Sequence, residues 1–432
     1  QGLAYLHSRN QLSTVDIYLA FSSLVAYYPA LLIEKQKVPL YLAGVLIIVA
    51  VIKILDLKIS PSRPNLKSHI VFAGMIFLIV YLSLDINNLR SITVFPAGQD
   101  GLEYQTFARN IFVFGDVFLE QTPPRAYKVL FPYIVGILHT VFGQSAAAQF
   151  IVNAWCVVLS SALAFTLAKN FKLPLQYAIL TSISFTIILC LPSSYVFYFR
   201  FGLIEAIAVL FLLATLTFAA KRQTLEMRLA AIITVLFRLD YLGLVIAAII
   251  LTSDPMIGGM KFAWGELLKW VNQNIKSILL YVLIIVMFPA LIIGSYFILV
   301  EGYELNASDT AQISLLSIIE GFMRVLFGGN LRDLQEMVSQ NSFEFLLITI
   351  PLALGFIISF LTIFHSRGIF AEIDLRLPLL IPSILPAYIV VRPTGYFSRF
   401  SFPILALNVI LIGIFLYNFK NEEMARLSRK NK

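Results

Sequence analysis

The chain has 432 residues, of which 59% are hydrophobic and only 13% are charged, and its mean hydropathy is +0.86. This composition excludes an ordinary water-soluble domain, and repeated apolar runs of roughly 20 residues indicate transmembrane helices. The formal net charge of +8 comes from scattered basic residues rather than from a basic soluble domain, which argues against a nucleic-acid-binding protein. Lipid offers no hydrogen-bond partner to the backbone, so the spans are expected to be helices.

The apolar runs predict an all-α polytopic membrane protein with about 10–12 transmembrane helices in one transmembrane domain, residues 1–432. Cys156 and Cys190 lie in apolar segments and indicate neither a disulfide framework nor a metal site. The expected spans, apart from an unusual segment considered below, are 12–33, 38–55, 69–84, 146–168, 174–192, 201–220, 276–300, 344–364, 375–391 and 401–417.

Two long polar connections separate these spans, at 85–145 and 301–343, and each contains a stretch with helical periodicity. Such stretches predict amphipathic helices that lie along the membrane surface. The apolar face of the first consists of Tyr104, Phe107, Ala108, Ile111 and Phe112, and its polar face of Glu103, Gln105, Thr106, Arg109 and Asn110. The second repeats the pattern with Leu315, Ile319, Phe322, Met323, Leu326 and Phe327.

Asp100 precedes the first of these surface helices and has two compatible interpretations. With Glu103 three residues later it has the spacing of a capping box, in which Asp100 is the helix N-cap. At the boundary between a polar loop and the membrane it is also a candidate general base, because a carboxylate can take the proton from an attacking hydroxyl.

Further along the chain, Arg125 and Lys128 precede an apolar helix, where basic side chains either extend towards lipid headgroups or bind a phosphate. Arg200 lies at the expected outer end of a span and Glu205 about one turn inside it. Their spacing of five residues is poor for a direct pair on a helix. Glu205 is therefore either a functional intramembrane acid or part of a local structural hydrogen bond.

The segment 228–252 is apolar but carries Arg238 and Asp240 at its midpoint, where charge is costly. With a cytoplasmic N-terminus, the later basic loops fall on the cytoplasmic side only if this segment enters the membrane and returns. We therefore expect two half-length helices with Arg238 and Asp240 at the tip, near the outer face. The alternative is one ordinary span that contains a buried Arg238–Asp240 pair.

The last polar constellation is an expected outer loop in which Arg392 and Arg399 bracket two aromatic residues. Outward arginines depart from the positive-inside trend, which indicates either a phosphate or anionic-lipid partner or simple headgroup anchoring.

In chain order, these pieces resemble the C-type integral-membrane glycosyltransferase superfamily, the GT-C fold. That family has an Asp-x-x-x-Tyr stretch after an early span, similar to Asp100–Tyr104, and a Tyr-Arg-x-Leu-x-Pro helix, similar to "YKVLFPYIVGILHTVFG". It also has a span with an acid near its outer end, matched by Glu205, a Thr-Arg-Pro-x-Gly segment similar to "TVLFRLDYLGLVI", and a late Arg-Tyr segment similar to "YFSRFSFPILAL". Lys128, Asp240, Tyr241 and Phe400 depart from the family pattern.

The resemblance implies transfer of a sugar from a polyprenyl-phosphate donor to a glycan, lipid or protein acceptor, on the extracytoplasmic face of the plasma or inner membrane. By analogy Asp100, with Glu103 and Tyr104 beside it, provides the catalytic base. Arg238, Arg392 and Arg399 are expected to bind the donor phosphate, with Arg125 and Lys128 as further candidates and Arg200, Glu205 and Asp240 as other polar residues of the site. We expect inversion at the anomeric carbon and no required metal. The alternatives are a transporter or flippase, or a polymerase or ligase, of lipid-linked saccharides.

Overall fold

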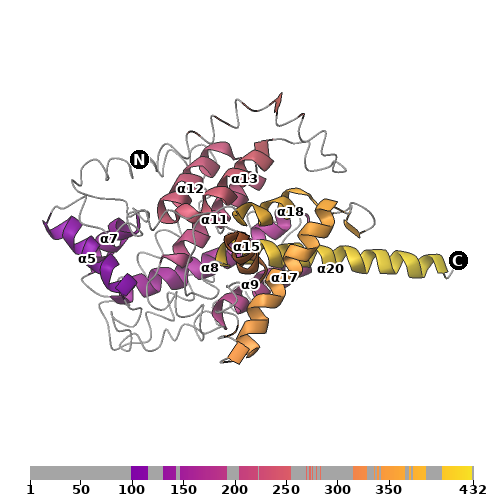
Figure 1. Cartoon of the computed structure of the whole chain (residues 1–432), viewed down its shortest axis with the longest axis horizontal. Helices are drawn as coiled ribbons and strands as arrows, with labels where there is room; N and C mark the ends of the chain where they lie inside the picture. The colour runs from indigo at the N-terminus through magenta and orange to yellow at the C-terminus, as the bar shows by residue number, and fades with distance from the viewer. Residues whose placement is uncertain are drawn as a thin grey trace, which may run out of the picture.

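The computed structural model describes residues 99–114, 130–142, 146–191, 204–221, 223–253, 315–327, 342–364, 369–370, 373–385 and 401–430, together with the single residues 269, 272, 273, 275, 279, 283, 335, 338 and 339. Nearly all of these residues are helical and none of them forms a strand (Figure 1). The predicted all-α class is therefore confirmed for the described part of the chain.

The described helices are α5 (Gln99–Phe114), α7 (Leu130–Phe142), α8 (Ala146–Asn170), α9 (Leu175–Cys190), α11 (Glu205–Ala220), α12 (Thr224–Phe237), α13 (Leu242–Ser253), α15 (Leu315–Phe327), α17 (Ser342–Phe364), α18 (Arg376–Leu380) and α20 (Phe402–Lys430). Two short 3₁₀ helices join them, η2 (Leu239–Tyr241) and η6 (Ile381–Ile384).

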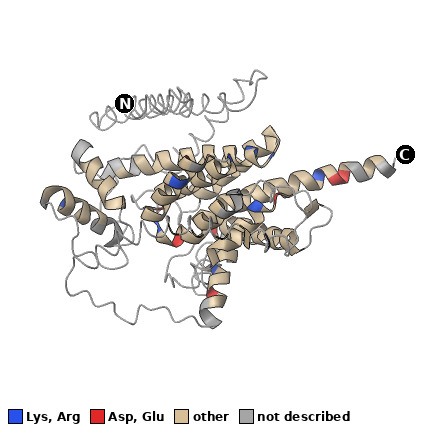
Figure 2. Ribbon diagram, turned by 90° about the horizontal axis from the view of Figure 1, so that it is seen from above, with Lys and Arg blue, Asp and Glu red and all other residues tan. Residues whose placement is uncertain are grey.

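Three of these helices contain a stretch long and apolar enough to cross a membrane, Val152–Asn170, Phe343–Phe364 and Phe402–Met424. Charged side chains are sparse along the packed helices, as lipid-embedded segments require (Figure 2). The spans expected at 12–33, 38–55 and 69–84, and nearly all of 276–300, lie outside the described residues. The last helix, α20, is longer than expected, since it continues past 417 to Lys430.

The bundle has two distinguishable ends, because α8 and α11 pack along each other in the same direction. Leu167 of α8 and Leu216 of α11, both near the C-terminal ends of their helices, line one cavity. At the opposite end, the Gln105 side chain of α5 donates a hydrogen bond to Gln149 in the first turn of α8. We call these the cavity end and the α5 end; α5 and α7 lie at the left of Figure 1 and the projecting end of α20 at the right.

Hydroxyl groups join neighbouring helices inside the bundle. Ser182 of α9 donates to the backbone carbonyl of Ser161 in α8 at 2.6 Å, and Thr186 donates to the Ser161 hydroxyl at 2.7 Å. Thr215 of α11 and Thr234 of α12 share a hydrogen bond of 3.3 Å. Small polar residues let apolar helices approach closely, and their hydroxyl groups find hydrogen-bond partners on the neighbouring helix. In a membrane, where the hydrophobic effect does not drive helices together, these contacts hold them to one another.

The α5 helix begins two residues earlier than the capping-box spacing predicted. It starts at Gln99, so Asp100 is its second residue rather than its N-cap. An acid in the first turn still suits the positive end of the helix dipole. Tyr104, Phe107 and Ala108 are buried as expected, and the Tyr104 ring meets Phe131 of α7 edge-on at 4.8 Å between centroids.

The apolar stripe of α5 is not buried along its whole length. Phe112 is 43% exposed, although its ring lies against Gly136 of α7. Gln105, placed by periodicity on the polar face, instead bonds to α8. The α5 helix packs on α7 and reaches α8 through the Gln105–Gln149 hydrogen bond, so one polar residue of α5 faces a neighbouring helix.

The α15 helix lies within the stretch 301–343, where a surface helix is expected, and it packs against α17. Phe322 packs edge-on against Phe356 of α17, and Thr349 of α17 donates to the Phe327 carbonyl. These contacts fall in the middle of the α17 span, so α15 lies beside that span rather than across its end. Ile319 and Phe322 stay exposed while Arg324 is buried and pairs with Glu320 at 3.5 Å. Periodicity alone cannot distinguish an apolar face that meets lipid from one that meets protein.

Candidate functional site

The segment 228–252 consists of two helices with a break at Arg238. The α12 helix ends at Phe237, and Arg238 has an extended backbone with φ −146° and ψ 105° before η2 and α13 follow. The backbone N–H of Arg238 still donates to Thr234, and its carbonyl accepts from the Tyr241 N–H. Because this turn satisfies its own backbone, it can exist away from water.

The second helix turns back toward the end where the first began. Arg238 bonds to Glu205, the first residue of α11, while Ala248 of α13 lines the cavity with Ala219 and Ala220 at the other end of α11. The chain therefore runs to the α5 end through α12 and returns through α13. This agrees with the predicted path that enters and returns, and it disagrees with one uninterrupted helix through 228–252.

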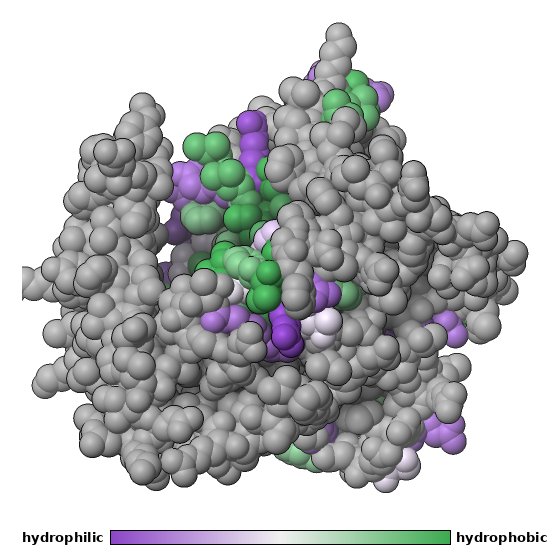
Figure 3. All heavy atoms as spheres, turned by 90° about the vertical axis from the view of Figure 1, so that its left-hand side faces the viewer, coloured by the Kyte–Doolittle hydropathy of each residue, from purple (hydrophilic) through white to green (hydrophobic). Residues whose placement is uncertain are grey.

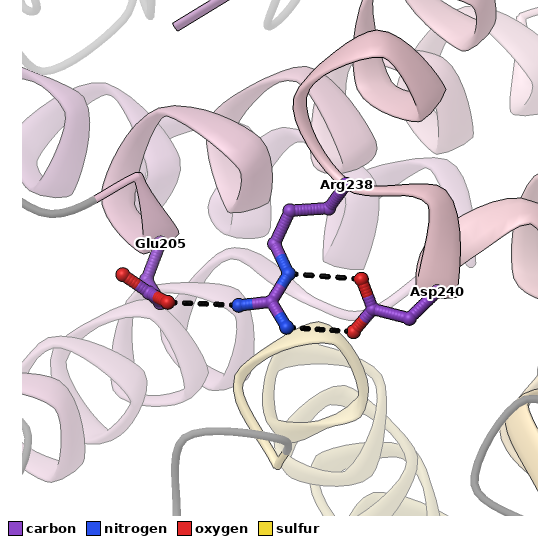
Figure 4. A network of polar contacts seen from close by, with 3 residues as sticks. All are labelled: Glu205, Arg238 and Asp240. Atoms are coloured by element: carbon purple, nitrogen blue, oxygen red, sulfur yellow. Dashed lines mark hydrogen bonds and ion pairs between the residues drawn. The ribbon is translucent and has the colours of Figure 1, made fainter. Parts of the chain in front are cut away.

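Three ionisable side chains meet at the break, and we call Glu205, Arg238 and Asp240 the Arg238 cluster (Figure 4). The Arg238 Nη1 group donates to Glu205 Oε1 at 2.8 Å. Its Nε and Nη2 groups donate to the two carboxylate oxygens of Asp240 at 2.9 and 2.8 Å. The pair with Asp240 is thus bidentate, the geometry that a planar guanidinium forms best with a carboxylate.

The cluster is almost completely enclosed. The side chains of Glu205, Arg238 and Asp240 are 0%, 5% and 11% exposed. Glu205 also opens α11, where the helix dipole favours a negative charge. The Tyr241 ring lies under the guanidinium at 5.3 Å, an additional favourable contact for a buried cation. Removing one member of such a buried group leaves an uncompensated charge and costs about 3–5 kcal/mol.

This geometry favours a structural role for Arg238 over direct binding of a donor phosphate. One cation between two carboxylates gives the cluster a formal charge of −1 if all three groups are ionised. A negative, enclosed cluster repels a phosphate, and the bidentate edge of Arg238 is already occupied by Asp240. We therefore treat Arg238 as a residue that holds the turn in place.

Gly243 allows η6 to pack directly against this turn. A Cβ atom at Gly243 would come within 2.6 Å of the Ser383 carbonyl oxygen in η6, so only a glycine allows this backbone contact. The contact ties the start of α13 to η6, and Arg392 and Arg399 come later in the sequence, outside the described residues.

The last described residues before 386–400 and the first ones after it both lie toward the α5 end. Arg376 and Leu380 of α18 line the cavity, while Ser383, farther along the chain, reaches Gly243 beside the Arg238 cluster. The α20 helix, which follows residues 386–400, passes the cavity at Leu407 and continues away from the α5 end. Figure 3 views the molecule from the α5 side of Figure 1, where hydrophobic and hydrophilic side chains of the described residues lie close together.

The remaining sequence-predicted residues are placed less completely. Tyr104 is fully buried against Phe131, which gives it a packing role. Asp100 and Glu103 lie in the first two turns of α5, but their side chains are outside the described part. Also outside the described residues are Arg125, Lys128, Arg200, Arg392 and Arg399.

The described residues contain no group of three or more His, Cys, Asp or Glu side chains that could hold a metal ion. The expectation that no metal is required concerns acids near Asp100 and stays a prediction.

Sequence reasoning missed two contacts at the α5 end. It compared Glu205 only with Arg200, whereas Glu205 bonds Arg238, 33 residues away. It assigned Gln105 to a polar surface, whereas Gln105 bonds Gln149. One signal was available for each pair, because Glu205, Arg238 and Gln149 are polar residues in otherwise apolar segments and such residues seek partners on neighbouring helices.

No protein-family model, no curated protein and no solved structure matches the chain.

Proposed function

We propose that the protein is a membrane glycosyltransferase that moves a sugar from a polyprenyl-phosphate donor to an extracytoplasmic glycan, lipid or protein acceptor. One observation carries the proposal. The helix that opens with Asp100 and the Arg238 cluster lie at the same end of the α8–α11 pair, although about a hundred residues separate them in sequence. A catalytic acid and the loops that bind its substrate must share one end of the bundle.

The distribution of basic residues supports an extracytoplasmic position for that end. Lys169 lies in the last turn of α8, Lys172 follows that helix and Lys221 follows α11, so all three lie at the cavity end. Basic residues collect on the cytoplasmic side of membrane proteins. The α5 end, with Asp100 in the first turn of α5, then faces away from the cytoplasm.

The proposed reaction is a single displacement at the anomeric carbon. Asp100 takes the proton from the acceptor hydroxyl, whose oxygen forms the new bond to the anomeric carbon. The bond from that carbon to the phosphate oxygen breaks, and polyprenyl phosphate leaves with its electron pair. The anomeric centre becomes oxocarbenium-like in the transition state. Cations that hold the departing phosphate therefore lower the barrier, and we assign this role to Arg392 and Arg399, with Arg125 and Lys128 as further candidates.

Arg238 acts as a positioning residue in this proposal. By holding Glu205 and Asp240 it fixes the turn between α12 and α13, and Gly243 in that turn contacts η6. The loop with Arg392 and Arg399 begins shortly after η6. Because the turn beside η6 is held in place, these arginines lose less conformational entropy when they bind the donor phosphate, which is the benefit of preorganisation.

The proposal is tested by incubating the purified protein with a synthetic polyprenyl-phosphate sugar and measuring released polyprenyl phosphate. Asp100→Asn keeps the size of the side chain but removes the base, so release should fall by about 10²–10⁴-fold, the usual contribution of general-base catalysis. Thermal stability should stay that of the wild type. The matched control is Glu226→Gln, an acid in the first turn of α12 at the cavity end, which should keep full activity. Full turnover in Asp100→Asn would exclude this aspartate as the base.

A second candidate function, transport of a lipid-linked saccharide, is favoured by one observation. A broken helix with a buried charge cluster is typical of transporter binding sites. The same assay distinguishes the two functions, because a transporter moves the intact donor across a vesicle membrane and releases no polyprenyl phosphate. A ligase or polymerase would instead require a diphosphate-linked oligosaccharide.

A further inference from the structure

Two consecutive residues attach α5, whose first turn carries Asp100, to two different helices. The Tyr104 ring is fully buried and meets Phe131 of α7 edge-on at 4.8 Å between centroids. The Gln105 side-chain amide donates a hydrogen bond to Gln149 Oε1 in the first turn of α8. Side chains of consecutive residues point about 100° apart around a helix. The two contacts therefore constrain both the position of α5 and its rotation about its own axis.

The two contacts constrain α5 in different ways. Tyr104 and Phe131 are held by apolar packing, which is not directional and tolerates small sliding movements. A hydrogen bond has a narrow range of lengths and angles, so it tolerates much less. Gln149 follows three alanines in α8 and its side chain is 5% exposed, and a buried amide needs a hydrogen-bond partner. The polar contact is thus the more exacting of the two.

The contact lies close enough to Asp100 to determine where that residue stands. Gln105 comes five residues after Asp100 in the same helix, about 7.5 Å along an axis that rises by about 1.5 Å per residue. The backbone hydrogen bonds of α5 join these residues into one unit, so a rotation at Gln105 also moves the first turn. A general base must lie about 2.6–3.2 Å from the proton that it takes, and a displacement of about 1 Å can lower the rate by about 10²-fold.

We propose that Gln149 is a positioning residue for Asp100, which it holds in place through Gln105 and the first turns of α5. The inference rests on the proposed function, because it takes Asp100 as the general base. Gln149 acts through another helix and does not touch the reacting atoms. The amide pair carries no charge, so its effect on Asp100 is geometric rather than electrostatic.

The test measures kcat and KM for the release of polyprenyl phosphate by the purified full-length protein from a synthetic polyprenyl-phosphate sugar. Gln149→Leu keeps the approximate size of the side chain and removes the hydrogen bond, so kcat should fall by about 10- to 100-fold. The KM for the donor and the pH at which activity is half-maximal should stay those of the wild type, since neither a donor contact nor a charge is lost.

Gln105→Leu removes the same hydrogen bond from the other side and should lower kcat to the same extent. The double variant Gln105→Leu/Gln149→Leu should be no slower than either single variant, because all three lack one and the same bond. Gln105 is only partly buried, so Gln105→Leu keeps the test decisive if Gln149→Leu fails to fold.

A second background separates positioning from a general loss of structure. If Gln149 acts through Asp100, Gln149→Leu should cause no further loss of the residual release in an Asp100→Asn protein. A loss of folded protein would instead lower the residual release by the same factor as in the wild type, and this outcome would overturn the inference.

Ser161→Ala is the matched control on α8. It removes a buried hydroxyl that accepts a hydrogen bond from Thr186 of α9, away from α5. Thr186 also donates to the Ser182 carbonyl and keeps that acceptor. The variant should keep the kcat of the wild type.

An activity-independent measurement tests the same contact. Nitroxide labels on Val113→Cys of α5 and Leu180→Cys of α9, both 58% exposed, report the distance between these helices by pulsed double electron–electron resonance. The native Cys156 and Cys190 are buried, which leaves the introduced cysteines as the accessible thiols among these four. Gln149→Leu should broaden or shift the distance distribution, because α5 loses its polar attachment.

The failure of this inference differs from the failure of the proposed function. Full turnover in Asp100→Asn would reject the base and, with it, the role of Gln149. If Asp100→Asn is inactive while Gln149→Leu and Gln105→Leu keep the wild-type kcat, only the inference fails. An unchanged distance distribution in Gln149→Leu would also overturn it, whatever the protein's activity.

Discussion

Arg238 and Arg376 stand at opposite ends of one bundle and share a local motif, yet their surroundings differ. Each pairs with an aspartate two residues away through the Nε–Nη2 edge of its guanidinium. Arg238 is also held by Glu205 from another helix and is 5% exposed, whereas Arg376 meets no second carboxylate among the described residues and is 21% exposed. The same short pattern therefore gives a buried scaffold at one end and a partly available cation at the other.

The difference shows that the second carboxylate decides what an arginine can do. A guanidinium has five N–H donors, and one aspartate that engages Nε and Nη2 leaves Nη1 open. At the α5 end Glu205 accepts from Nη1, so the arginine serves to join α11 to the turn after α12. At the cavity end Nη1 of Arg376 has no acceptor among the described residues, so this donor stays available.

The largest loss of stability is expected at Arg238. We expect Arg238→Met to destabilise the folded state by about 3–5 kcal/mol, because it leaves Glu205 and Asp240 buried together without a cation. Thermal unfolding in detergent micelles measures this as a large fall in Tm. Lys420→Met, at an exposed position on α20, is the control and should leave Tm unchanged.

A variant that also carries Glu205→Gln and Asp240→Asn should recover much of the loss, since no buried charge then remains uncompensated. If Arg238→Met alone melted like the wild type, water would have to reach the cluster, and the enclosed arrangement described above would be wrong.

Gly243→Ala tests the contact that links the cluster to η6 and should have an intermediate effect. Alanine favours a helix by about 1 kcal/mol over glycine, so an open position would gain stability. Here the new Cβ meets a backbone carbonyl at 2.6 Å, and backbone cannot move aside as a side chain can. We expect a net loss of about 1–2 kcal/mol, measured by the same melting experiment.

Gly136→Ala provides the contrast for that experiment. Its Cβ would meet ring atoms of Phe112, a side chain that is 43% exposed and can rotate away. A neutral or stabilising effect at Gly136 beside a loss at Gly243 would attribute the loss to the Ser383 carbonyl. Equal effects at the two glycines would contradict that assignment.

The smallest effect is expected at Arg376. Replacing it by Met should cost less than about 1 kcal/mol of stability, because a partly exposed ion pair is screened by solvent and its aspartate can regain water. The melting curve should hardly move. A loss as large as that of Arg238→Met would show that Arg376 is also a scaffold and would remove the contrast between the two ends.

Several elements follow directly from the sequence. The spans predicted at 146–168, 174–192 and 344–364 correspond to α8, α9 and α17 with small shifts at their ends. The interruption of 228–252 was also predicted, because a charged pair at the midpoint of an apolar segment conflicts with a plain span. These predictions succeed because apolar run length and isolated charges report on a residue's surroundings whichever helix is its neighbour.

Other features could not be read from local pattern. The stripe of α15 is equally periodic whether it faces lipid, water or protein, so its place beside the middle of α17 could not be predicted. The same holds for the contact of Gly243 with Ser383, since 140 positions separate the two residues and neither carries a charge that signals the other.

By itself, the sequence determined that this chain is helical, belongs in a membrane and breaks one apolar segment at Arg238. The length of an apolar run and a charge inside it set the free energy of placing that segment in lipid, whichever helix lies beside it. The tertiary structure decided which carboxylates reach each arginine, and therefore which arginine is enclosed and which borders a cavity. That choice depends on the directions in which whole helices pack, a property that no single segment contains.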